Sequence, residues 1–185
     1  TALDTALDAI DKVRDTADAF ERIFLVEVMG RHTGYLAVAA GIAAGAEQNI
    51  FPELATELNL DKISEHVEQT RKHRGKCSYI IVIAETMYPA GATALAVELT
   101  TASGIECRAC VLGHLQRGGT PVAFDRNLGN RLGLAAADAL NDGAYGQMVA
   151  LHGTNIVRVA LESATGVLKT VPAERYREAT AFFGA

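Results

Sequence analysis

The sequence predicts an α/β fold, a mostly parallel open sheet with helices on both of its faces. Short runs of apolar, often β-branched residues alternate along the chain with longer segments of helical periodicity, as in parallel strands joined by helices. The predicted strands are apolar almost throughout, which is typical of a sheet covered on both sides. The chain of 185 residues is long enough to bury a core and is predicted to form one domain over residues 1–185.

Each element is predicted from its local pattern. Helices show apolar residues at helical spacing with charged or small residues between them, and strands are short apolar runs closed by Gly, Pro or polar turns. In chain order we predict a helix over 1–20, a strand over 23–28, a helix ending near Ala46, a strand over 49–51, a helix from Asp61 to about 74–76, a strand over 78–84, a helix over 92–102, a strand over 108–112, a helix over 122–141, strands over 147–151 and 156–161, and a helix over 173–183.

Composition and charge exclude several classes of protein. Hydrophobic residues make up 49% of the chain and charged residues 21%, as in ordinary globular proteins. The net charge of −5 argues against a nucleic-acid partner, because no basic stripe could neutralise many phosphates. The longest uncharged apolar run, 35–46, is too short to cross a bilayer, so no membrane partner is predicted. The chain starts at Thr1 without a signal peptide, and we expect a processed, trimmed or recombinant fragment.

The cysteines are predicted to be structural. Cys107 and Cys110 have the spacing of a metal or redox pair, but we place both on one strand, where residues three apart point to opposite faces. Their sulfur atoms then cannot converge on a metal. Sparse, unpaired cysteines are typical of a reducing compartment, so we expect a cytoplasmic protein and predict no metal site from these residues.

Polar turns follow three of the predicted strands. Met29-Gly30-Arg31 follows the first, Glu85 the third, and the stretch 113–121 the fourth. The carboxyl ends of parallel strands meet at one edge of a sheet, so we expect these turns to lie together. Cations for a phosphate, a carboxylate for hydroxyls and glycines for close backbone approach suit a phosphorylated polyol. Taken singly, each residue would more simply be a helix cap or a solvated charge.

His114 and Arg117, followed by Gly118-Gly119, predict a phosphate cradle. Arginine offers a planar fork of donors, histidine a second donor, and the glycines free backbone amides. The alternative is a glycine-rich turn whose arginine faces water.

Arg22 and Arg108 stand at the beginnings of strands instead. A strand of six residues would put them roughly 20 Å from the other edge of the sheet. They are either ordinary flanking charges or residues that reach the pocket of a neighbouring subunit.

These strings resemble the phosphofructokinase family. The resemblance rests on VEVMGRHTG at 26–34, IAET at 83–86 and RACVLGHLQRGGTPVAFDR at 108–126, in the family's order. It implies that Met29, Gly30 and Glu85 hold the sugar of fructose 6-phosphate and that His114 and Arg117 hold its 6-phosphate. It also implies that Arg31 lies near the transferring phosphoryl group and stabilises transition-state charge.

The resemblance also implies an oligomeric, regulated enzyme of glycolysis. Arg22 and Arg108 match two arginines that the family donates across a subunit interface, so a homo-oligomer, dimer or tetramer, is expected. The family transfers phosphoryl from ATP or pyrophosphate, with Mg²⁺ on the donor. A regulatory nucleotide site is implied at Arg14, Gly45, Glu47, Arg74 and Lys76, although 77–78 are uncharged where the bacterial regulated members tend to show basic residues. Apart from the family, the stretch 74–76 is simply a charged helix end.

The sequence lacks two of the family's motifs. The glycine-rich donor loop and the Thr-x-Asp-x-Asp segment with the catalytic base appear nowhere in these residues. The chain therefore resembles the second half of a phosphofructokinase, which supplies sugar-phosphate binding, and we predict that it is inactive in isolation. Two alternatives remain, a non-catalytic sugar-phosphate-binding or regulatory module, and an α/β scaffold whose basic turns are coincidental.

Overall fold

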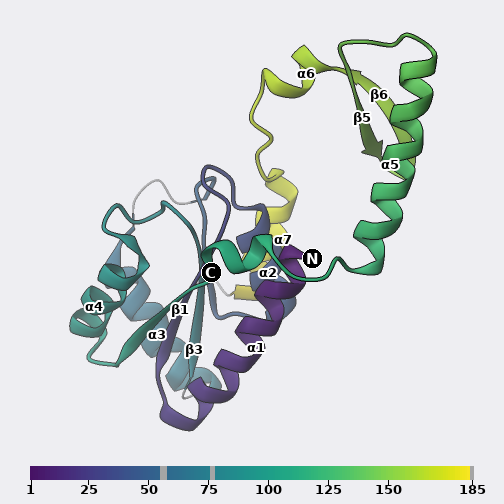
Figure 1. Cartoon of the computed structure of the whole chain (residues 1–185). Coiled ribbons are helices and arrows are strands. Elements are labelled where there is room, and N and C mark those ends of the chain that lie inside the picture. The colour runs from purple at the N-terminus through teal and green to yellow at the C-terminus, as the bar shows by residue number, and fades with distance from the viewer. Residues whose placement is uncertain (55–57, 76–77, 184–185) are drawn as a thin grey trace. The chain divides into compact units, whose positions relative to one another are not determined.

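The computed structural model describes residues 1–54, 58–75 and 78–183, and the chain divides into two compact units. The larger, here the sheet unit, comprises Ala2–Gly119 and Thr170–Ala185, and the smaller, here the hairpin unit, comprises Thr120–Lys169 together with Thr1. Each unit is described by itself (Figure 1). The division reflects contacts within the chain, and the single domain over residues 1–185 stays a prediction.

The sheet unit is built on four parallel strands in the order β2-β3-β1-β4. Together with the flanking helices, this confirms the predicted α/β class with a parallel sheet. The strands are β1 (Ile23–Val28), β2 (Gln48–Ile50), β3 (Tyr79–Ala84) and β4 (Cys107–Val111), and the helices of this unit are α1 (Ala2–Phe20), α2 (Tyr35–Ala44), α3 (Leu60–Arg74), α4 (Gly91–Ser103), the 3₁₀ turn η1 (Gly113–Arg117) and α7 (Ala173–Phe183).

Side-chain alternation along the strands divides the core into two layers. Val26 and Val82 pack with α1 and α2 on one face of the sheet. Leu25 and Ile81 pack with α3 and α4 on the other. Figure 1 shows these two helix pairs on opposite sides of the strands. Because β3 is buried at every position, it accounts for the strong apolar signal of 78–84.

Three helices of the sheet unit, α2, α3 and α4, end where glycine permits a left-handed turn. The second helix was expected to reach about Ala46 but ends at Ala44, because Gly45 at φ 61° caps it and reverses the chain. Gly75 and Gly104 cap α3 and α4 in the same way. The other boundaries lie within one or two residues of those predicted, and η1 is a short helical turn within the predicted loop.

The hairpin unit contains α5 (Ala123–Asn141), β5 (Gln147–His152), β6 (Asn155–Ala160) and α6 (Leu161–Thr165). Both strands were predicted, and they pair antiparallel around a turn at Gly153, while α6 was not predicted. This unit leaves large apolar side chains in solvent, with Leu134 68% exposed and Tyr145 78% exposed. Its own elements therefore do not bury its apolar surface.

The two described cysteines lie on opposite faces of the sheet, as predicted. Cys107 packs among the α3 and α4 side chains, whereas Cys110 packs on the α1 and α2 side. Both are free thiols, and burial raises the pKa of Cys107 to about 12. Cys77 lies outside the described residues. Among the residues described, no helix is long and apolar enough to cross a membrane.

Candidate functional site

The loop between β1 and α2 is shaped by two glycines with no room for a side chain. The Thr33 amide donates to the Gly30 carbonyl oxygen at 2.9 Å, and a Cβ at Gly30 would clash with the Thr33 carbonyl. A Cβ at Gly34 would lie 2.5 Å from the Cβ of buried Phe51. The Gly34 amide donates to Glu53 Oε2 at 2.8 Å. Close backbone approach thus fixes the loop that carries Met29, Gly30 and Arg31.

The β3–α4 loop is bound directly to this loop. Glu85 Oε1 accepts hydrogen bonds from the Gly30 amide at 3.2 Å and the Arg31 amide at 3.0 Å. Thr86 Oγ1 donates to the Arg31 carbonyl oxygen at 2.6 Å. Glu85 Oε2 makes no hydrogen bond within the part of the chain that the structure describes, so this oxygen is available to a ligand hydroxyl.

Gln116 joins η1 to the β1–α2 loop. Its side chain is 3% exposed; Oε1 accepts from the Met29 amide at 2.7 Å, and Nε2 donates to the Ala2 carbonyl oxygen at 3.3 Å. The three turns that the sequence placed at one edge of the sheet are therefore brought together by hydrogen bonds. Gln116 itself was not singled out from the sequence, because nothing in a glycine-rich loop indicates which amide group turns inward.

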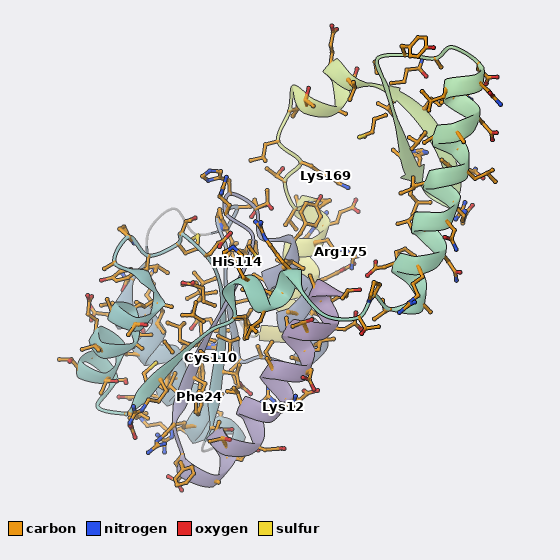
Figure 2. All side chains as sticks on the ribbon, viewed as in Figure 1. Lys12, Phe24, Cys110, His114, Lys169 and Arg175 are labelled. Carbon is orange, nitrogen blue, oxygen red and sulfur yellow. The ribbon has the colours of Figure 1, made fainter. Side chains whose placement is uncertain are left out.

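His114 and Arg117 extend from η1, and both are exposed. Residues three apart on a 3₁₀ turn lie on the same side, so the two side chains can reach one anion. Figure 2 labels His114 on this turn. Neither side chain, nor that of exposed Arg31, forms a hydrogen bond or ion pair with the described residues. These three side chains can therefore donate hydrogen bonds to an anionic ligand.

Glu27 adds a second carboxylate near Glu85. It lies half-buried on β1, near the backbone amide of Ala92 at the start of α4. Burial raises the pKa of Glu27, and the negative charge of Glu85 raises it further. The sequence showed Glu27 only as a charge that interrupts an apolar strand. A charged residue within an otherwise apolar strand was the sequence feature that could have indicated Glu27 as part of this edge of the sheet.

The opposite, amino edge of the sheet holds Arg22 and Arg108 against one carboxylate. Arg22 Nε lies 2.6 Å from Glu106 Oε2, and Arg108 Nε donates to Glu106 Oε1 at 2.7 Å. The Arg22 guanidinium also lies over the Phe20 ring, 4.8 Å from its centroid. The hydrogen bond from Arg108, and then the charge of Arg22, lowers the pKa of Glu106. The arginines lie where strand position predicted, but Glu106 was missed.

Three of the five residues of the implied effector site form a cluster. Arg14 lies 3.3 Å from Glu47 Oε1 and donates to the carbonyl oxygens of Ala44 and Gly45, each at 3.0 Å. Glu47 is buried, and its Oε2 accepts from the Ile80 amide at 2.8 Å. The cluster ties α1 to the sheet. The side chain of Arg74 and the whole of Lys76 lie outside the described part, and the nucleotide-binding role stays a prediction.

A groove of about 530 Å³ runs beside η1 in the sheet unit. Its lining includes Asp8 and Lys12 of α1 together with His114, but not Met29, Glu85 or Arg117. The groove therefore borders the candidate site at His114 without coinciding with it. Among the described residues, no group of three or more His, Cys, Asp or Glu could hold a metal ion.

The chain matches known proteins along most of its length. The family model described as Phosphofructokinase matches residues 1–140. The chain is 45% identical to the pyrophosphate–fructose 6-phosphate 1-phosphotransferase of Amycolatopsis mediterranei and 43% identical to the ATP-dependent 6-phosphofructokinase of Mycobacterium tuberculosis. Both alignments cover 100% of this chain and 59% of the relative, so the chain spans about three-fifths of the length of these relatives.

Solved structures agree in fold. Phosphofructokinase from Saccharomyces cerevisiae superposes with a TM-score of 0.78 at 34% identity, covering 98% of this chain and 24% of that one. A pyrophosphate-dependent phosphofructokinase from Marinobacter aquaeolei gives a TM-score of 0.76 over 98% of this chain and 53% of its own, and at 23% identity this is a likeness of fold alone. From the family model, the relatives and the fold together, the chain belongs to the phosphofructokinase family.

Proposed function

We propose that the chain is the sugar-phosphate-binding part of a phosphofructokinase, which transfers a phosphoryl group from ATP or pyrophosphate to the 1-hydroxyl of fructose 6-phosphate. The observation that carries the proposal is the joining of three loops at the carboxyl edge of the sheet by Glu85, Thr86 and Gln116. Arg31 and Arg117, which form no ion pair with the described residues, lie on two of these loops. Relatives named for each donor support both donor classes equally.

The 6-phosphate is assigned to His114 and Arg117. Both are exposed on the same side of η1, and neither is held by a described side chain. Charge-assisted hydrogen bonds from an arginine fork and an imidazole favour a phosphate over a neutral group. The sugar ring would then lie towards Met29, Gly30 and Glu85, where Glu85 Oε2 can accept from a hydroxyl.

Arg31 is assigned to the transferring phosphoryl group. Negative charge spreads over the oxygens of this group in the transition state, and a fixed guanidinium stabilises it there. Arg31 is exposed at the same edge, and its amide is already held by Glu85. In the full-length phosphofructokinase, Arg31→Ser should reduce kcat far more than affinity for the sugar. An equal loss in both would contradict the assignment.

Magnesium would accompany the phosphoryl donor and neutralise charge on its phosphates. The described residues do not form a metal site of their own, since no group of three or more His, Cys, Asp or Glu gathers among them. We therefore assign no step of the reaction to a metal held by this chain. The donor site and the base that activates the 1-hydroxyl are assigned to the rest of the enzyme.

The proposal extends to assembly and regulation. Arg22 and Arg108 would serve the sugar-phosphate site of a neighbouring subunit in a homo-oligomer, dimer or tetramer. The cluster of Arg14, Gly45 and Glu47, with Arg74 and Lys76, would take a regulatory nucleotide. The enzyme would act in glycolysis in the cytoplasm.

Titration calorimetry with fructose 6-phosphate tests the proposed site. The wild-type protein should bind, and His114→Ala/Arg117→Ala should weaken binding at least tenfold, because about 1.4 kcal/mol corresponds to a tenfold change and two charge-assisted bonds are lost. The matched control is Lys62→Ala/Lys72→Ala, which removes two exposed cations from α3 and should leave binding unchanged. Equal effects of the two double variants would point to a general charge effect and count against the site.

A further inference from the structure

Thr86 and Arg31 share an unusual backbone conformation. Among the described residues other than glycine, positive φ occurs at Glu21, Arg31 and Thr86, and the values at the last two are 48° and 73°. The left-handed region is disfavoured for all L-residues and most strongly for β-branched ones such as threonine. Strain of this kind persists only where the surroundings enforce it, and it concentrates at functional sites. Here two strained residues lie on neighbouring loops of one candidate site.

The two strained residues are joined through the backbone of Arg31. Glu85 Oε1 accepts from the Arg31 amide at 3.0 Å, and Thr86 Oγ1 donates to the Arg31 carbonyl oxygen at 2.6 Å. Two consecutive residues of the β3–α4 loop therefore hold both polar backbone groups of Arg31. Fixing the groups on both sides of one Cα restricts φ and ψ of that residue together.

The position of Thr86 argues against a role in packing. Its side chain is exposed and belongs to neither layer of the core. Glycine would adopt the same φ without strain, but it has no hydroxyl to bond the Arg31 carbonyl. What threonine contributes at this position is therefore the hydroxyl group.

We propose that Thr86 is a positioning residue, which locks Arg31 in its left-handed conformation so that the guanidinium is presented to the reacting phosphoryl group from a fixed backbone. This inference rests on the role proposed above for Arg31. A fixed cation needs little reorganisation as charge develops, so loss of the lock slows the chemical step more than it weakens sugar binding.

Four variants of the full-length phosphofructokinase test the proposal by steady-state kinetics. Thr86→Val keeps the branched shape and removes the hydroxyl, Thr86→Gly removes both the hydroxyl and the strain, and Thr86→Ser keeps the hydroxyl. The matched control is Thr101→Val on α4, which removes an exposed hydroxyl that donates to the Val97 carbonyl oxygen at 3.2 Å. We expect Thr86→Val and Thr86→Gly to lower kcat about tenfold with KM for fructose 6-phosphate nearly constant. Thr86→Ser and Thr101→Val should retain wild-type kinetics.

A merely structural role gives a different pattern. Thr86→Gly relieves the strain at this position. If Thr86 mattered only for folding, this variant would therefore have the melting temperature and kcat of the wild type. Recovery of kcat by Thr86→Gly, or an unchanged kcat in Thr86→Val, overturns the proposal. Melting temperatures measured on the same samples separate a loss of fold from a loss of positioning.

A readout without substrate separates this inference from the proposed function. In the ¹⁵N-labelled chain, Thr86→Val and Thr86→Gly should shift the backbone amide signals of Gly30 and Arg31, whereas Thr86→Ser and Thr101→Val should leave them in place. Unmoved signals in Thr86→Val show that the hydroxyl does not set the Arg31 backbone and overturn the proposal. If wild-type enzyme transferred no phosphoryl group, the proposed function would fail, and the amide signals alone would decide whether Thr86 holds Arg31.

Discussion

At the carboxyl edge of the four-stranded sheet, side chains bond the backbone of neighbouring loops, whereas at the amino ends of β1 and β4 charged side chains pair with one another. Glu85, Thr86 and Gln116 bond backbone groups of the β1–α2 loop. At the amino edge, Arg22 and Arg108 are both paired with Glu106. At the carboxyl edge, neutral and acidic side chains therefore make the structural hydrogen bonds, and Arg31 and Arg117 form no ion pair with the described residues. At the amino ends of β1 and β4, both arginines are paired with Glu106.

The difference indicates where a small anion can bind within one chain. A cation without a partner has only its hydration to lose, and loops that are already fixed add little ordering cost on binding. A cation paired with a carboxylate must share or give up that partner. We therefore expect a small anion to bind at the carboxyl edge within one chain, whereas an anion at the amino edge would have to displace Glu106 from Arg22 and Arg108.

The largest expected effect is the loss of stability in Gly34→Ala at the carboxyl edge, which is compared with the loss in Gly104→Ala at the amino edge. Gly34→Ala would force a methyl group against Phe51, which is fully buried and cannot move aside. Overpacking of this kind costs about 3 kcal/mol. Gly104→Ala meets no atom within 4 Å and costs only the left-handed conformation, about 1 kcal/mol. Urea unfolding followed by circular dichroism measures both losses. Equal losses would show that the carboxyl-edge loop is not tightly packed.

The second prediction removes the bond between η1 and the β1–α2 loop. Gln116→Leu leaves the part-buried Met29 amide without its partner, which costs about 2 kcal/mol. Fructose 6-phosphate affinity should fall about tenfold, since His114 and Arg117 lose the support of their turn. Gln69→Leu, an exposed glutamine on α3, is the matched control for urea unfolding and calorimetry. Wild-type affinity in Gln116→Leu would contradict the role given to this bond.

The sequence predicted the sheet better than it predicted the bonds that assemble the site. Apolar strands followed by polar turns specify a parallel sheet, and a parallel sheet places all its carboxyl ends at one edge, so Met29, Glu85 and the 113–121 stretch could be brought together by topology alone. The same reasoning put Arg22 and Arg108 at the other edge.

Partners far apart in sequence could not be predicted in this way. Gln116 bonds Met29 across 87 positions, and a single sequence holds no signal that pairs them. Glu106 lies next to strand residues but was overlooked beside the arginines it holds. The end of α2 differs from the prediction for a simpler reason, because the left-handed turn at Gly45 stops the helix before its apolar run is complete.

The third prediction concerns Glu27 and pH. Burial raises the pKa of Glu27 in the folded protein, so its protonated form is favoured by folding. The stability this gives is present below the ordinary glutamate pKa of 4.5 and is lost as pH rises through the raised value. Glu27→Gln keeps the size of the side chain and its polar oxygen, and should remove this part of the pH dependence, with a small gain in stability at pH 7. The midpoints of urea unfolding, measured between pH 4 and 7 for the wild type and Glu27→Gln, give this pH dependence. If the midpoints of both proteins changed equally with pH, burial of Glu27 would not be the cause.

The smallest expected effect comes from separating the arginines at the amino edge. Glu106 is partly exposed, and its pKa is lowered by Arg108 and then by Arg22, so the stability it gives is present above pH 4.5 and is lost as pH falls through the lowered pKa. Glu106→Gln should barely move the unfolding midpoint at pH 7, because surface ion pairs contribute little. Solvent exchange of the Arg22 and Arg108 Nε protons, measured by NMR, should nevertheless become faster in Glu106→Gln. The matched control is Glu68→Gln, which breaks the exposed pair with Lys72 and should leave the exchange of these protons unchanged.

Binding then decides whether the two edges act separately within one chain. Glu106→Gln changes only the amino edge, so calorimetry should give the wild-type affinity for fructose 6-phosphate, in contrast to Gln116→Leu. A weaker affinity would mean that the pairing of Arg22 and Arg108 is transmitted along β1 and β4 to the loops at their carboxyl ends. The register that aligns Phe24 with Arg108 and Glu27 with Val111 offers the direct route for such coupling. In that case the contrast between a ligand-ready edge and a self-paired edge would have to be replaced by one connected site.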